Sequence, residues 1–390
     1  MNYAIIKVKV GGTRMENILT YLKWRGDLSF SEKTLNEADS LIFALLSYIE
    51  WEDIIGETAV SLQEACRDYC ERYDQKHFNK TYSFSPSLSE LIRILPNITR
   101  YQDVKLSHYR VFNDKQEEVQ FGAICIELPQ NMVYVSYRGT DISILGWKED
   151  FNMTYQDVIP SQTMAVSYLK EIGKALFKQK KRWQFKRKTP PLLYIGGHSK
   201  GGNLAIYAAI CCNELSPWIK GVYSFDGPGF RKTFYEQHDP SFIFDRLHHY
   251  IPESSIFGRL LEHREPARII KAYGTGLIQH DAFYWKVDTD HFVYADTLSK
   301  ESDQIKLYLD QVLMNKSDEE KKTFIMLLYK MLDEMKVESI NDFTAVGFRQ
   351  WLRGIKELSN MSKEEYKMFY ELLKLAFMQS RSLLYDRIKR

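Results

Sequence analysis

The sequence predicts an α/β fold in which a largely parallel β-sheet lies between two helical regions of the chain. Between about residues 106 and 288, short runs rich in β-branched and aromatic residues alternate with helical stretches. Before residue 100 and after residue 300, apolar residues recur at helical spacing instead. The composition, 44% apolar and 27% charged over 390 residues, is that of a globular protein. It excludes a disordered chain, a collagen-like repeat and a small disulfide scaffold.

The first region, residues 1–100, is expected to be helical and to pack on the sheet. Apolar residues such as Leu41, Leu45 and Ile49 follow the spacing of one helix face. Asp39 and Ser40 stand before this run and are typical of a helix start.

The second region, residues 101–299, holds the predicted sheet. Seven short runs have the composition of buried strands. They are Tyr109–Phe112, Phe121–Leu128, Met132–Tyr137, Leu192–Ile195, Val222–Phe225, Leu247–Ile251 and Ile269–Tyr273. Helical stretches at about 161–178 and 203–213 separate some of these runs, which favours parallel pairing in the second half of the sheet.

The third region, residues 300–390, is predicted to be a helical C-terminal extension rich in Leu, Met, Lys and Glu. Apolar residues such as Phe324, Leu327, Leu328 and Met331 form one face of a helix. We expect a small bundle that packs on the sheet region or on a partner.

Charge and cysteine usage limit the partners and the compartment. The net charge is +2, so no overall field steers the protein to nucleic acid, and no nucleic-acid partner is expected. Five cysteines without a CxxC pair predict reduced, mostly buried thiols. No convincing signal peptide and no apolar run of membrane-spanning length is present in the sequence, so a cytoplasmic protein is expected.

One segment carries the most specific chemical signal. The apolar run Leu192–Ile195 leads into Gly197-His-Ser-Lys-Gly201, and an alanine-rich helix follows at once. This is a G-x-S-x-G motif in the strand-turn-helix context of a nucleophile elbow. The glycines let neighbouring backbone come close, and the helix N-terminus directs N–H groups toward a developing oxyanion. Ser199 is therefore predicted to be a catalytic nucleophile.

A serine nucleophile needs a base, and in this kind of site the histidine follows the serine and the acid along the chain. His280 lies in a loop just beyond the last long predicted strand, where such a base belongs. His291 is the runner-up, because a further polar segment precedes it. His248 and His249 lie inside a predicted strand and are expected to pack or to face solvent.

Two carboxylates are candidates for the acid. Asp226 ends the strand after the elbow helix, and Glu253 ends the next strand. Both positions suit an α/β sheet, which places its site at the C-terminal ends of strands. Asp226 is favoured because Gly227 and Gly229 allow close approach to an imidazole. Glu253 remains the alternative.

The oxyanion hole is expected where two strands end. The run Met132–Tyr137 leads into Arg138-Gly-Thr-Asp141, where Gly139 permits a tight turn that brings the N–H and hydroxyl of Thr140 toward the site. The backbone N–H of Lys200, next to the nucleophile, is the second expected donor.

Three segments together resemble a known family. They are Tyr137-Arg-Gly-Thr-Asp141 followed by Gly146-Trp-Lys-Glu-Asp150, the elbow Gly197-His-Ser-Lys-Gly-Gly202, and His280 followed by Phe283-Tyr-Trp285. They resemble the fungal-type (class-three) lipases of the α/β-hydrolase superfamily. With the opening segment Tyr21–Phe30, Ser224–Phe230 and Gln279-His-Asp281, the chain is more similar still to an uncharacterised bacterial branch of lipase-like hydrolases.

The resemblance covers about residues 17–290 and implies an α/β-hydrolase fold with a Ser-His-acid site. It carries over Ser199, His280 and Thr140. It departs at the acid, because the fungal-type lipases use an Asp-x-Val-Pro-like loop where this chain has Glu253, whereas an acid at Asp226 resembles the pancreatic-type lipases.

The predicted function is therefore a serine hydrolase that cleaves a carboxylic ester of a lipid or another acyl compound through an acyl-enzyme. Two alternatives stay open: a non-catalytic α/β-hydrolase scaffold used for binding, and an acyl transferase or thioesterase on the same site. No cofactor is expected, and no metal either, since no HExxH or paired His/Asp cluster is present in the sequence.

Two further segments bear on the substrate. The basic run Lys178–Lys188 is either a solvated helix end or a transient contact with an anionic membrane surface. The segment Ser254–Leu261 is apolar on one side and is expected to be a lid or acyl-binding wall, or else a core helix.

Overall fold

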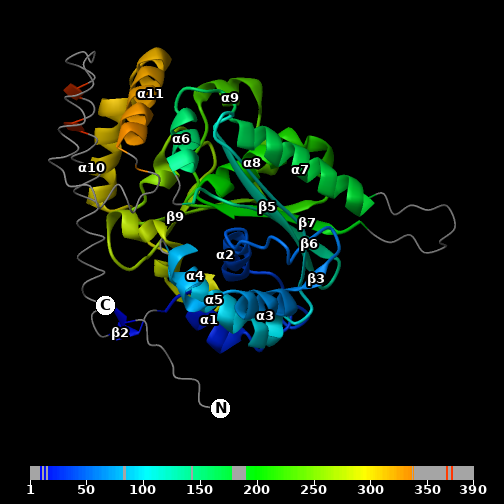
Figure 1. Ribbon diagram of the computed structural model, residues 1–390. Helices are drawn as coiled ribbons and strands as arrows, with labels where there is room; N and C mark the ends of the chain where they lie inside the picture. The colour runs from blue at the N-terminus through cyan, green and yellow to red at the C-terminus, as the bar shows by residue number, and fades with distance from the viewer. Residues whose placement is uncertain are drawn as a thin grey trace.

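An eight-stranded sheet forms the centre of the protein. The computed structural model describes residues 9–10, 13–14, 16–81, 85–141, 144–177, 190–335, 337, 366–367 and 370–371. The strands of the sheet are β3 (Val60–Ser61), β4 (Lys105–Asp114), β5 (Val119–Leu128), β6 (Met132–Tyr137), β7 (Leu192–His198), β8 (Ile219–Phe225), β9 (Leu247–Pro252) and β10 (Ala267–Ile270). They lie in the order β10-β9-β8-β7-β6-β5-β4-β3 (Figure 1).

The pairing changes along the sheet. The strands from β6 to β10 pair in parallel, whereas those from β3 to β6 pair antiparallel. Each of the seven predicted runs coincides with or overlaps one strand. This confirms the predicted α/β fold, with a mostly parallel central sheet whose second half is parallel throughout. All six residues of β6 are buried, as is typical of a strand covered on both faces.

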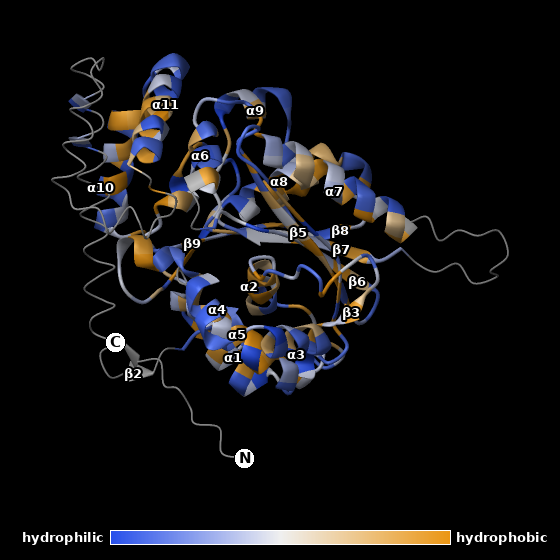
Figure 2. Ribbon diagram, in the orientation of Figure 1, coloured by the Kyte–Doolittle hydropathy of each residue, from blue (hydrophilic) through white to orange (hydrophobic). Residues whose placement is uncertain are grey.

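Helices cover both faces of the sheet (Figure 1). One face carries the N-terminal helices α1 (Ile18–Arg25), α2 (Glu37–Leu46), α3 (Leu62–Arg72), α4 (Gln75–Thr81) and α5 (Ser87–Ile94). The other face carries α7 (Pro160–Phe177), α8 (Lys200–Cys211) and α9 (Lys232–Gln237). Helix α2 lies against β6 and β7 and is largely orange in Figure 2, whereas much of α3 is blue. A helix that is apolar on all its sides is expected to be buried on all of them, and nearly every residue of α2 is buried.

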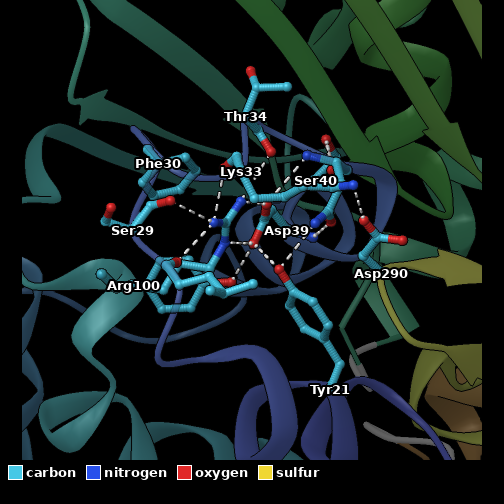
Figure 3. Close-up of polar contacts among 12 residues, drawn as sticks. Tyr21, Ser29, Phe30, Lys33, Thr34, Asp39, Ser40, Arg100 and Asp290 are labelled. Atoms are coloured by element: carbon cyan, nitrogen blue, oxygen red, sulfur yellow. Dashed lines mark hydrogen bonds and ion pairs between the residues drawn. The ribbon is translucent and has the colours of Figure 1, made fainter.

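A buried arginine fixes the loop between α1 and α2. The Arg100 guanidinium donates to the carbonyl oxygens of Leu28, Lys33 and Thr34 and forms an ion pair with Asp39 (Figure 3). The hydroxyl of Tyr21 also donates to Asp39. Buried charges require such partners. The segment Tyr21–Phe30 therefore has a structural role, because it supplies part of this network.

The C-terminal extension packs beside α6 (Ile144–Asn152) (Figure 1). Up to residue 335, the part that the structure describes without a gap, it comprises α10 (Lys300–Leu309), a π-helical turn (Asp310–Met314) and α11 (Asp318–Glu334). Phe324 and Met331, predicted on one helix face, are buried in a core to which Phe151 and Tyr155 contribute. The extension therefore packs on the sheet region through α6.

Two short hairpin pairs complete the described strands: β1 (Lys9–Val10) with β2 (Thr13–Arg14), and β11 (Val287–Asp288) with β12 (His291–Phe292). The basic run Lys178–Lys188 lies outside the described residues. Among the helices that the structure describes, none has both the length and the apolarity needed to cross a membrane.

Candidate active site

The turn between β7 and α8 holds Ser199 in a strained conformation. Its backbone has φ 57° and ψ −133°, a region that residues other than glycine rarely adopt. A side chain at Gly197 would collide with the backbone of Gly201, and one at Gly201 would collide with the carbonyl of Tyr137. The Ser199 N–H donates to the Phe225 carbonyl at 2.8 Å. These contacts form the sharp strand-turn-helix geometry that the motif predicts.

Ser199, His280 and Asp226 lie in one hydrogen-bonded chain. His280 ends the 3₁₀ turn Gly276–His280, and its Nε2 is 3.0 Å from Ser199 Oγ. Its Nδ1 is 2.6 Å from Oδ2 of Asp226, which directly follows β8 and is fully buried. A carboxylate only accepts, so Nδ1 carries the proton and Nε2 accepts from the serine hydroxyl. This tautomer suits a general base at Nε2.

Asp226 is held in its charged form. Burial by itself raises the pKa of the carboxyl, but the hydrogen bond and charge of His280, with the hydroxyl of Ser255, outweigh it and bring the pKa below its ordinary value. Oδ1 accepts from the Ser255 hydroxyl and, at 3.0 Å, from the Gly258 N–H. Both oxygens of the carboxylate are therefore bonded, as a buried charge requires.

The other predicted candidates lie elsewhere. Glu253 is half-buried at the end of β9, its backbone is bonded to Ile270 and Ser299, and its side chain makes no hydrogen bond to His280 within residues 190–335. His291 is exposed in β12 beside Asp290. The structure thus joins the favoured acid and base and leaves the two alternatives apart.

The candidate oxyanion loop lies against the elbow. A Cβ on Gly139 would come within 3.0 Å of Ser199 Cβ. The Thr140 hydroxyl, which we expected to face the site, donates to Asp150 Oδ2 at 2.6 Å. The backbone N–H of Thr140 is then the candidate donor on this loop. Lys200 begins α8, and its side chain is fully buried.

Two neighbouring residues were not found from the sequence. His198 Nε2 lies 2.8 Å from the His280 carbonyl and donates to it, so His198 Nδ1 accepts from the Tyr48 hydroxyl at 3.0 Å. Burial, with the charge of His280, lowers the pKa of His198 to about 3, so this imidazole is neutral at pH 7. The only sequence signal for a role of His198 was its place in the G-x-S-x-G motif. Tyr48 lies in an apolar run, and no sequence signal pointed to a role for it.

Aromatic rings cover the imidazole. Phe257 lies in the turn Phe257–Arg259 with its ring centroid 4.2 Å from that of His280, and Trp147 of α6 packs on Phe257 at 5.6 Å. Phe257 of the segment Ser254–Leu261 thus lies against His280, and the core-helix alternative is wrong, since only three residues of the segment are helical. A polar cavity of about 270 Å³ lies at another place, beside Lys33 and Arg100.

Among the residues that the structure describes, one cluster brings together side chains of the kinds that bind metals. Ligand atoms of His249, His263 and Glu265 lie within 4.8 Å of one another. Each of these side chains already has a partner in the protein, because His249 contacts Ser224 Oγ and the Gly258 carbonyl, and His263 Nδ1 contacts Glu265 at 2.8 Å. The cluster is a hydrogen-bonded packing unit beside the loop that donates to Asp226, in which His263 Nε2 is buried without a hydrogen-bond partner in the described part of the chain.

A family model described as Mbeg1-like matches residues 95–330. The chain belongs to the Mbeg1-like family. The matched span contains Thr140, Ser199, Asp226 and His280, and it begins after the N-terminal helices α1 to α5. No curated protein matches the chain.

Solved structures of two lipases are similar to this Mbeg1-like protein. M37 lipase is 16% identical with a TM-score of 0.32, over 56% of this chain and 68% of that one. Lip2 lipase from Yarrowia lipolytica is 12% identical with a TM-score of 0.32, over 52% of this chain and 84% of that one.

Proposed function

We propose that this Mbeg1-like protein is a serine hydrolase that cleaves a carboxylic ester. Ser199 is the nucleophile, His280 the general base and Asp226 the acid. The observation that carries the proposal is the chain Ser199 Oγ to His280 Nε2 at 3.0 Å and His280 Nδ1 to Asp226 at 2.6 Å. It stands at a strained turn between a strand and a helix N-terminus, the context in which such a serine reacts.

The reaction follows from these contacts. His280 Nε2 takes the proton of Ser199 as Oγ attacks the ester carbonyl, and Asp226 stabilises the imidazolium that forms. The N–H groups of Thr140 and Lys200 stabilise the oxyanion of the tetrahedral intermediate. His280 then protonates the leaving alcohol. Water attacks the acyl-enzyme by the same route and releases the carboxylic acid.

The walls of the site favour an apolar acyl group. Phe257 lies against the His280 ring and Trp147 packs on Phe257, so both offer aromatic surface rather than charge near the imidazole. An acyl or lipid ester is therefore the proposed substrate class, with transient contact between Lys178–Lys188 and an anionic membrane as part of the proposal. A cytoplasmic location is also proposed, and the five cysteines, all free thiols, support it.

Hydrolysis of a panel of p-nitrophenyl esters with short, medium and long acyl chains tests the proposal, with and without anionic vesicles. We expect turnover by the wild type and a loss of about 10⁶-fold in kcat for Ser199→Ala. An acyl thioester in the same panel separates ester from thioester cleavage. Turnover that survives in Ser199→Ala, or its absence in the folded wild type with every ester, would contradict the proposal.

A further inference from the structure

A fully buried ion pair lies directly behind the nucleophile. Lys200 Nζ is 2.6 Å from Glu149 Oε2, and both side chains have 0% exposure. Nζ also donates to the Gln120 carbonyl at 2.9 Å. Lysine and glutamate are almost never fully buried, and the removal of two charges from water offsets most of their attraction. The charge attraction alone therefore does not account for the presence of this pair, and its hydrogen bonds to the surrounding backbone point to a positioning role.

The pair connects four segments that surround the elbow. Glu149 belongs to α6 and accepts from the Ser161 N–H at the start of α7, at 2.9 Å. It also accepts from the Gln120 N–H in β5, at 3.1 Å. Lys200 belongs to the first turn of α8, next to Ser199. The directions of these hydrogen bonds fix how α6 and α8 lie relative to each other.

The next residue of α6 contacts the other side of the candidate oxyanion hole. Asp150 Oδ2 accepts from the Thr140 hydroxyl at 2.6 Å, and Oδ1 is 3.9 Å from Lys200 Nζ. Adjacent carboxylates of one helix thus contact both residues whose N–H groups we propose as oxyanion donors. The Lys200 ammonium also compensates the negative charge that these carboxylates would otherwise place behind a developing oxyanion.

We propose that Lys200 and Glu149 are positioning residues for the oxyanion hole. Their buried ion pair holds the backbone N–H groups of Lys200 and Thr140 in a fixed position relative to each other. The inference rests on the proposed function and adds a role for two side chains that do not touch substrate. Preorganised donors stabilise the charge that develops in the transition state. A displacement of these donors therefore lowers kcat and leaves substrate binding nearly unchanged.

The test uses Glu149→Gln, Lys200→Met and the double variant, each in the full chain. For a p-nitrophenyl ester we expect kcat to fall about 10²-fold in each variant, as when one oxyanion donor is lost, with KM nearly unchanged. The inhibition constant of a trifluoromethyl ketone, which mimics the tetrahedral intermediate, should rise by the same factor as kcat/KM falls. A purely structural role would change neither quantity in folded protein.

A second buried ion pair in the same protein provides the matched control. Arg100 and Asp39 are 1% and 0% exposed and belong to the N-terminal helical region, with partners other than the elbow (Figure 3). The double variant Arg100→Met/Asp39→Asn should lower the thermal midpoint while kcat of the folded protein stays at the wild-type value. Assays are run below the midpoint of every variant, as measured by circular dichroism.

Two outcomes distinguish failure of this inference from failure of the proposed function. Wild-type kcat and inhibition constant in folded Glu149→Gln would overturn the positioning role, while Ser199 labelling by a fluorophosphonate stays intact. Glu149→Gln keeps the shape of the side chain, so it decides the matter even if Lys200→Met does not fold. If the wild type is neither labelled nor active on any ester, the proposed function fails, and the inference falls with it.

Discussion

Asp226 and Glu253 both stand at the ends of strands in the parallel half of the sheet, yet only Asp226 faces an imidazole. Asp226 has a backbone φ of 53°, and the turn that this conformation allows brings its carboxylate to His280 Nδ1. It also receives hydrogen bonds from Ser255 and Gly258. This set of donors keeps the carboxylate charged and orients it toward the ring.

Asp226→Asn should therefore lower kcat about 10⁴-fold, because the amide no longer holds the productive tautomer or stabilises the imidazolium. The matched variant Glu253→Gln should keep kcat near the wild-type value. Steady-state kinetics of the two variants measures the difference. A nearly normal kcat for Asp226→Asn, with collapse of activity in Glu253→Gln, would assign the acid to the later strand.

Tyr48→Phe tests the support behind His280. The change removes the hydroxyl that donates to His198 Nδ1, and His198 in turn donates to the His280 backbone. We expect kcat to fall about fivefold, the equivalent of about 1 kcal/mol for one lost hydrogen bond.

Tyr134→Phe is the control for this prediction, because the buried Tyr134 hydroxyl donates to the Ser40 carbonyl instead. It should lose about the same unfolding free energy, about 1 kcal/mol, at unchanged kcat. Equal kcat in the two variants would mean that Tyr48 serves stability alone.

The sequence predicts residues of this site to the extent that the signal is local. Ser199 stands in a strand-turn-helix motif, and His280 follows the last long strand, so both were predicted. The acid remained open between two strand ends, since the direction of a side chain after a strand depends on turn geometry. Tyr48 is 150 residues from His198 in the sequence, and no spacing rule connects them.

At the scale of elements, the start of α10 is bonded to the loop that serves Asp226. The Ser302 hydroxyl donates to the Ser255 carbonyl, and Arg259 forms an ion pair with Asp303 at 2.9 Å. Arg259 also donates to Ser302 Oγ at 2.9 Å. The C-terminal extension therefore stabilises the turn that carries Phe257 and the donors to Asp226.

Arg259→Met should loosen this connection. We expect a decrease of kcat of severalfold and a small loss of unfolding free energy, less than about 1 kcal/mol because the partner Asp303 is exposed. Lys306→Met is the control, since Lys306 pairs with Asp310 and stays clear of the loop. Ester turnover and urea unfolding of both variants measure the two effects, and unchanged kcat in Arg259→Met would contradict a link between α10 and the site.

The sequence predicts these elements better than their packing. The C-terminal helices were expected from apolar spacing, but the surface that they cover was left open between the sheet region and a partner. The structure places α11 against α6, through contacts such as Lys148 with the Tyr329 ring. Helical spacing shows that a face is apolar and does not show which surface completes it. The division of the chain at residues 100 and 299 stays a prediction.

For the whole molecule, buried neutral histidines predict how stability depends on pH. Burial, as the main cause, lowers the pKa of His198 to about 3 and that of His249 to about 4. In the unfolded chain both take an ordinary value of about 6.5. The unfolded state therefore binds more protons below pH 6.5, so stability is fully present above that pH and decreases as the pH falls toward the folded values.

Each of these histidines should contribute a slope of up to about 1.4 kcal/mol per pH unit between about pH 6 and pH 4.5. Urea unfolding at a series of pH values measures the slope. His249→Gln removes one titrating group and should reduce the slope by the contribution of one histidine, up to about 1.4 kcal/mol per pH unit. An unfolding free energy that is constant over this range would show that these imidazoles are already protonated or exposed in the folded protein.

The position of a fluorophosphonate adduct tests the central claim most directly, because the reagent reports the nucleophile without knowledge of the substrate. Digestion and mass spectrometry of the labelled full chain should find the adduct on Ser199. Labelling should be nearly lost in His280→Ala and retained in His291→Ala. An adduct on another serine, or none in protein that is folded by circular dichroism, would contradict the claim that Ser199 and His280 form the catalytic centre.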